Sequence, residues 1–346
     1  MNLQHRPDAT ADLLLPVAAT LLGHGSDEWV QRLDRAVERW GWDRFTRVLW
    51  ENRISLRTAY AFQHRLPSVA PERWKSLIEA EEKRQKKMLD YMQLLSERLE
   101  LEFMFIKTVD NFPDFGHDVD LLTRESGKRV HEEFLKKGFS RGDQTLAERI
   151  SDKMNFTIDN SCPAEAHCAR IGEFGEHREF TQYLLDHRVP VQLGGLEVWG
   201  ATYPARVLLL VAQRLYRHFT LRTCDVLNAV SWFRAGAVTV SELYELASRF
   251  GFLPGARWFV RFLNEVEESC GGEPVVEAER RSDVLCCDRN LFRFSRVRFV
   301  PLMVGGKLLW SLSRLKWSSF GRELLFVPIG AMAVVSYKVF KRRGFW

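Results

Sequence analysis

The chain has 346 residues, of which 46% are hydrophobic and 27% charged, and its formal net charge is +5 at pH 7. A chain of this length and composition can build a proper core in two or three domains, which excludes an intrinsically disordered protein. Its six scattered cysteines exclude a disulfide framework, so we expect a reducing, cytoplasmic location.

Residues 1–100 are predicted to be helical. The first 23 residues combine a polar, mixed-charge start with a short apolar stretch, which makes a poor secretory signal. A helix is expected over 27–50 with Asp27 as its N-cap, and a second one over 71–102, where Pro71 suits the first turn. Large apolar residues mark one face of the first helix at three- and four-residue steps: Trp29, Leu33, Val37 and Trp40.

The pattern changes at Leu101, where short apolar runs replace the helical spacing. Such runs, rich in aromatic and β-branched residues, are typical of strands. The predicted elements are strands over 101–109, 117–123 and 154–161, a helix over 126–141 that stops at Gly138, and a hairpin over 189–202 that turns at Gly194-Gly195.

Helical spacing returns from residue 204 to 265. We therefore predict an α+β protein, in which a small mixed-sheet core is flanked by N-terminal and C-terminal helical regions. The predicted parts are a helical region over 1–100, an α/β core over 101–203, a helical domain over 204–290 and a basic, apolar tail over 291–346.

Two aspartates, Asp118 and Asp120, stand one residue apart at the start of the predicted strand 117–123. Because side chains alternate along a strand, both are expected to project from the same face. Two neighbouring carboxylates repel each other, and Mg²⁺ relieves this repulsion while completing its shell with water and phosphate oxygens. The alternative is a solvated strand edge or turn.

The segment "FIKTVDNFPDFGHDVDLLT", residues 105–123, followed by the helix end "LKKGF", resembles the nucleotidyltransferase superfamily with the polymerase-β-like fold. Within it, the segment is most similar to a poorly characterised family of bacterial and archaeal nucleotidyltransferase-like proteins. The resemblance covers about residues 101–160 and extends more weakly over 204–235. It implies that the predicted α/β core is a nucleotidyltransferase core.

The resemblance also implies a magnesium-dependent transfer of NMP from a nucleoside triphosphate, such as ATP, to a hydroxyl acceptor. Asp118 and Asp120 would be the catalytic metal ligands, and a third carboxylate would come from a neighbouring strand. Asp159 is the candidate for this third group, although it also suits an Asx-turn that ends its strand. Lys107 and Thr108 stand where the superfamily has Gly-Ser, and would contact phosphate through an ammonium and a hydroxyl group.

Other clusters carry weaker signals. Cys162, His167 and Cys168 lie close in sequence, but the spacing fits no common zinc pattern, so core or turn cysteines are favoured. His218 lies among Arg214, Arg217 and Arg222, which suits either a phosphate site or an exposed helix face. Nothing in the sequence indicates a nucleic-acid partner.

The C-terminal tail concentrates positive charge. From Leu291 onward eleven Lys and Arg residues oppose one acidic residue, so the tail carries +10 and the remaining chain −5. The uncharged run 324–337 is short for a membrane span, which needs roughly 20 residues. Its basic and aromatic flanks, Trp310 among them, predict an interfacial helix on an anionic lipid surface, peripheral at the inner face of the membrane. A helix docked on the protein's own core is the alternative.

Two functions are thus open at this point. The first is the magnesium-dependent nucleotidyltransferase, which the presence of both aspartates favours. The second is a catalytically inactive binding or scaffold protein of the same fold, associated with a membrane through its tail, which the loss of Gly-Ser favours.

Overall fold

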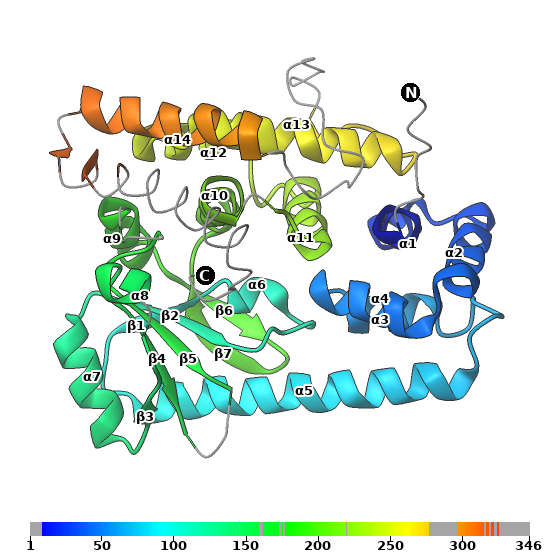
Figure 1. Ribbon diagram of the computed structural model, residues 1–346, viewed down its shortest axis with the longest axis horizontal. Coiled ribbons are helices and arrows are strands. Elements are labelled where there is room, and N and C mark those ends of the chain that lie inside the picture. Colours follow the sequence, from blue (N-terminus) through cyan, green and yellow to red (C-terminus); the bar gives the residue numbers. More distant parts are fainter. Residues whose placement is uncertain are drawn as a thin grey trace, which may run out of the picture.

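The computed structural model describes residues 9–144, 146–158, 162–172, 175, 177–218, 220–276, 296–314, 316, 317, 320, 321 and 324. Helices at both ends of the chain surround a central sheet (Figure 1). A long helix, α5 (Pro71–Arg98), runs along one side of the molecule, and α12 (Val240–Phe250), α13 (Leu253–Ser269) and α14 (Arg296–Ser313) run along the opposite side. The predicted α+β class is confirmed.

The sheet has five strands in the order β1-β2-β5-β4-β3. Their bounds are Phe103–Ile106 for β1, Val119–Thr123 for β2, Ser140–Arg141 for β3, Lys153–Thr157 for β4 and Ala164–Cys168 for β5. The central pair, β2 and β5, is parallel and the other pairs are antiparallel, so the sheet is mixed. Parallel pairing sets Asp120 beside Glu165 at the same level of the sheet.

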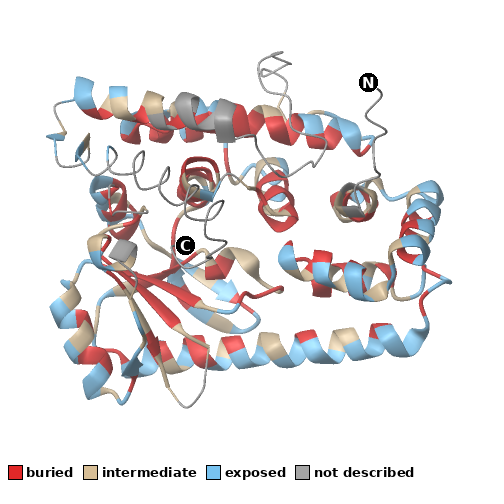
Figure 2. Cartoon of the chain, in the orientation of Figure 1, coloured by how far each residue is buried: buried red, intermediate tan, exposed pale blue. Residues whose placement is uncertain are grey.

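Alternation along β1 and β2 divides the core between the two faces of the sheet. Phe105 and Leu121 join a hydrophobic cluster with α5 and α7 (Gly127–Lys136). Met104 and Leu122 join a second cluster with α10 (Tyr203–Gln213) and the other helices. Strands β2 and β5 are buried along their whole length, and Figure 2 shows these strands in red. Asp120 shares the second face with Leu122, so its carboxylate points toward α10.

The N-terminal helices are α1 (Ala9–Ala19), α2 (Asp27–Trp40), α3 (Trp42–Glu51) and α4 (Ser55–Phe62). A single helix over 27–50 was therefore the wrong prediction. The chain breaks at Gly41, whose φ of 83° lies in a region that glycine adopts without steric cost. Asp27 is not the cap either, because the Ser26 hydroxyl accepts the hydrogen bond from the Trp29 amide at 3.5 Å. The helix predicted over 71–102 is confirmed, with Pro71 in its first turn.

The predicted hairpin is confirmed as β6 (Val189–Leu193) and β7 (Leu196–Gly200). The remaining short elements are a π-helical turn over Thr20–His24, α6 (Thr108–Asn111), α8 (Leu146–Ile150), α9 (Arg178–Asp186) and a second π-helical turn over Arg214–His218. The helical segment 204–235 is interrupted by that second turn and resumes as α11 (Thr223–Arg234). This interruption lies next to the site described below.

The start of the tail forms α14, which packs on the helical domain. Lys307 donates a hydrogen bond to the carbonyl oxygen of Phe250, and Trp310 lies against Gly251. Beyond the helix, Lys316 pairs with Glu179. Within the described part of the chain no helix is long and apolar enough to cross a membrane. The predicted interfacial run 324–337 lies, apart from Leu324, outside the described residues.

Candidate functional site

A cavity of about 420 Å³ lies between the polar face of the sheet and α10. Strands β2 and β5 supply acidic groups on one side, while the second π-helical turn and Arg222, which directly precedes α11, supply basic groups on the other. The charged residues that line the cavity are Arg53, Lys107, Asp110, Asp118, Asp120, Lys153, Glu165, Arg214, Arg217, Arg222 and Asp225, together with His117 and His218.

The centre of the acidic side is a buried group of three residues, Asp120, Glu165 and His167. One ligand atom of each lies within 4.8 Å of the others. The His167 Nε2 atom is 3.2 Å from Asp120 Oδ1 and 2.9 Å from Glu165 Oε1. Glu165 and His167 share one face of β5 because they are two residues apart, and the sheet register adds Asp120 from β2.

Two lysine side chains form ion pairs with the carboxylates of this group. The Lys107 ammonium pairs with Asp120 and lies 3.5 Å from Glu165 Oε1, while the Lys153 ammonium lies 2.5 Å from Glu165 Oε2. Burial alone would raise the pKa of Glu165, but Lys107, His167 and Lys153 hold it well below its usual range. Burial likewise opposes the charge of Lys107, yet Asp120 and Glu165 raise its pKa above the usual value.

Asp118 precedes β2 and lines the same cavity as Asp120. It makes no ion pair with a described residue. Burial and the nearby carboxylates of Asp120 and Glu165 raise the pKa of Asp118, whereas Lys107 and Arg53 oppose the rise. The Asp118 carboxylate is thus less compensated than those of Asp120 and Glu165, which pair with lysines.

Lys107 and Thr108 take different roles. Lys107 has a φ of 56°, in the left-handed region that favours glycine. Thr108 is buried, and its hydroxyl accepts a hydrogen bond from the Asp120 amide at 2.9 Å. In this structure the Thr108 hydroxyl holds the strand that carries Asp120, and the contact of Thr108 with phosphate stays a prediction.

The predicted third carboxylate, Asp159, lies outside the described residues. Glu165 instead stands beside Asp120, and the sequence analysis missed it. The segment 164–168 alternates small apolar residues with Glu165 and His167, which is the same period-two signal that singled out Asp118 and Asp120. The alternation also separates His167 from Cys168, whose side chain lies in the hydrophobic cluster on the other face, as expected for a core cysteine.

The acidic group has the donor set for a divalent cation. Carboxylates from two adjacent strands and one imidazole converge, and a cationic group already fits among them in the form of Lys107. Asp118, Asp120 and Glu165 are the oxygen ligands that suit Mg²⁺. A metal ion in this position requires the Lys107 ammonium to move off Asp120 and Glu165.

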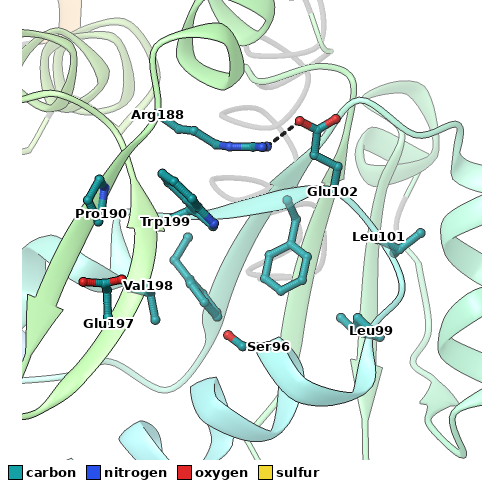
Figure 3. Close-up of a pocket in the computed structure, with 11 residues that line it drawn as sticks. Ser96, Leu99, Leu101, Glu102, Arg188, Pro190, Glu197, Val198 and Trp199 are labelled. Atoms are coloured by element: carbon teal, nitrogen blue, oxygen red, sulfur yellow. Dashed lines mark ion pairs between the residues drawn. The ribbon is translucent and has the colours of Figure 1, made fainter.

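A second cavity, of about 410 Å³, lies between β1, β7 and the end of α5 (Figure 3). Two of its charged side chains satisfy each other, because Arg188 pairs with Glu102 at 2.6 Å, and Arg188 also stacks on Trp199. Aliphatic and aromatic side chains form most of the remaining wall. The two cavities are similar in size, so the convergence of carboxylates and cations is what selects the first as the candidate site.

No family model matches this chain, and neither does any curated protein or solved structure. The family assignment therefore stays a proposal that rests on the motif and on the chemistry of the cavity.

Proposed function

We propose that the protein is a magnesium-dependent nucleotidyltransferase that moves NMP from a nucleoside triphosphate to a hydroxyl acceptor. The observation that carries the proposal is the meeting of Asp118, Asp120 and Glu165 in one cavity, opposite a wall of arginines. The acidic side suits metal ions and the basic side suits phosphate oxygens. The volume of about 420 Å³ suits a ligand of nucleotide size.

Each side chain has a role in the proposed reaction. Asp118, Asp120 and Glu165 hold Mg²⁺, which when bound neutralises triphosphate charge and makes the α-phosphorus more electrophilic. Lys107, released from the carboxylates, turns its ammonium to a phosphate oxygen. Asp118 lines the cavity and makes no ion pair with a described residue, so among the three carboxylates it has an oxygen available to accept the proton of the attacking hydroxyl.

The reaction balances without any further reactant. The acceptor oxygen forms a bond to the α-phosphorus as the bond from that phosphorus to the bridging oxygen breaks. Pyrophosphate leaves, and the hydroxyl proton passes to Asp118 and then to solvent. We place this reaction in the cytoplasm, with the basic tail close to an anionic membrane surface.

The test is thermal stability with each of the four Mg-NTPs, followed by a pyrophosphate-release assay with candidate acceptors. One nucleotide is expected to stabilise the protein by about 2.7 kcal/mol at a hundredfold excess over its Kd. Asp118→Asn, Asp120→Asn and Glu165→Gln are expected to abolish the shift, whereas the exposed control Glu132→Gln retains it. If no nucleotide shifts the wild-type protein, the enzyme proposal fails.

One observation favours the second candidate, an inactive binding protein. Lys107 and Lys153 already neutralise Asp120 and Glu165, so the site is electrostatically satisfied without a metal. The same assays separate the two candidates. Stabilisation by a nucleotide without pyrophosphate release for any acceptor supports the binding protein, and release that depends on Asp120 supports the enzyme.

A further inference from the structure

Arg53 is an unusual residue in the wall of the cavity. Its side chain is only 7% exposed, yet it lines the cavity, and its Nε and Nη1 atoms have no hydrogen-bond partner. Within the described part of the chain no carboxylate lies at ion-pair distance, and its main contact is the face of the Trp50 ring, 5.0 Å away. A buried cation with so few partners is costly unless an anion joins it.

Arg222 lies on the same wall and likewise makes no ion pair with a described residue. Burial and the neighbouring Arg222 lower the pKa of Arg53 to about 10, and burial and Arg214 lower the pKa of Arg222. Arg214 differs from both, because its guanidinium pairs with Asp225 at 2.8 Å. Two arginine side chains are thus held together on this wall against their mutual repulsion.

The fold enforces this pairing through Asn52. The Asn52 side-chain oxygen accepts hydrogen bonds from the amide and the hydroxyl of Thr223, both at 3.1 Å, and its backbone oxygen accepts one from the Cys224 amide at 3.2 Å. These contacts hold together the backbone segments that carry Arg53 and Arg222, and both side chains line the cavity. The amides of Thr223 and Cys224, at the start of α11, already donate to Asn52, so an anion would be bound by the two guanidinium groups. The dipole of α11 adds positive potential at the same place.

We propose that Arg53 and Arg222 form a phosphoryl-binding subsite that takes its oxyanion without a metal ion. This inference rests on the proposed function only in placing the ligand in the same cavity. The Arg53 guanidinium and the Asp118 carboxylate both border Gly116, where an added Cβ atom would lie 3.2 Å from Arg53 Nη2 and 3.3 Å from Asp118 Oδ1. The ligand group is either the distal phosphates of the nucleotide or a phosphate carried by the acceptor. Two guanidinium groups suit the bidentate binding of either.

The test is calorimetric titration of inorganic phosphate and pyrophosphate in EDTA, so that no metal contributes. The full-length wild-type protein is expected to bind at least one of them, and Arg222→Gln and Arg53→Gln are each expected to weaken binding by about tenfold. Arg53→Lys retains the positive charge and is expected to retain more anion affinity than Arg53→Gln. Equal losses in both variants would point to misfolding as the cause. Asp118→Asn is expected to tighten binding, because it removes a negative charge beside the subsite. The exposed α7 variant Arg129→Gln is the matched control and keeps wild-type affinity.

A second titration, with Mg-NTP, distinguishes the two sources. A parallel loss of Mg-NTP affinity in Arg222→Gln assigns the subsite to the nucleotide, and an unchanged affinity assigns it to a phosphorylated acceptor. Absence of metal-free binding at about 10 mM of either anion, or equal binding by wild type and Arg222→Gln, overturns the subsite. If the subsite is overturned but the protein still binds Mg-NTP, the proposed function stands. If the protein binds the anion without metal but binds no Mg-NTP, the proposed function is overturned and the subsite stands.

Discussion

Lys107 decides the electrostatic state of the candidate site. Its ammonium contacts Asp120, Glu165 and His167 at once, with Nζ 3.3 Å from His167 Nε2. A group with one positive charge thereby occupies the place that suits a divalent ion. Metal binding and the Lys107 contact draw on the same oxygens, so the two compete.

Replacement of Lys107 by Met is therefore expected to have two opposite effects. Without the ammonium, Asp120 loses its ion-pair partner and Glu165 keeps only Lys153, so the metal-free protein is expected to lose about 3 kcal/mol of unfolding free energy. The affinity for Mn²⁺, used as a probe for Mg²⁺, is expected to rise about tenfold. Denaturant unfolding and Mn²⁺ titration measure the two effects.

The control for this substitution is Lys136→Met, on the exposed part of α7. It removes the same charge from the chain, but its exposed ammonium pairs with Glu100 at 3.5 Å and not with a carboxylate of the site. Unchanged Mn²⁺ affinity in Lys107→Met would show that the ammonium and the metal do not compete.

Among the elements, α14 depends on one glycine of a neighbouring helix. Gly251 ends α12 with a φ of 77°, and a Cβ atom there would lie 2.5 Å from Trp310 Cδ2 of α14. The side chain of Lys307 adds a hydrogen bond to Phe250 and lies 4.3 Å from the Trp310 ring centroid. The start of the basic tail is in this way part of the helical domain.

The substitution Gly251→Ala is expected to destabilise the protein by about 3 kcal/mol, since it adds a steric clash with Trp310 to the backbone cost of a left-handed alanine. Gly236→Ala provides a matched control, because Gly236 has a φ of 67° and open space around its Cα. Its cost is expected to be about 1 kcal/mol, that of the backbone alone. Equal losses for the two variants in urea unfolding would mean that Trp310 does not pack tightly on α12.

The whole molecule has an uneven distribution of charge, with +10 in residues 291–346 and −5 in the rest. Docking of α14 and association of the remaining tail with lipid are compatible, because they use different segments. Lys338, Lys341, Arg342 and Arg343 form the densest basic cluster of the tail. The association with an anionic surface stays a prediction.

Full-length protein is expected to sediment with phosphatidylserine vesicles, and replacement of these four basic residues by Gln is expected to reduce binding by at least about tenfold, given about 1 kcal/mol for each charge near the surface. The control replaces four lysines that are exposed on the body, Lys75, Lys83, Lys128 and Lys136, and is expected to bind as wild type does. If both sets of substitutions reduce binding alike, net charge rather than the tail drives the association.

Short-range patterns in the sequence predict the local elements of this protein and one side of its candidate site. Period-two alternation in 117–123 and the glycines at 138 and 194–195 act within a few residues, so β2, the end of α7 and the β6–β7 hairpin were all predictable. For the same reason the sequence predicted Asp118, Asp120 and Lys107 as members of the cluster around Asp120, but not Glu165.

The remaining partners in the candidate site come from contacts between segments that lie far apart in the sequence. Glu165 lies 45 positions after Asp120, and the two meet because β2 and β5 pair in parallel, which no local pattern specifies. The segments that carry Arg53 and Arg222 are held together by the hydrogen bonds of Asn52 to Thr223 and Cys224. Local spacing predicts which side chains of one strand or helix share a face. Which residues of other elements contact that face depends on how the buried surfaces of the whole chain pack together.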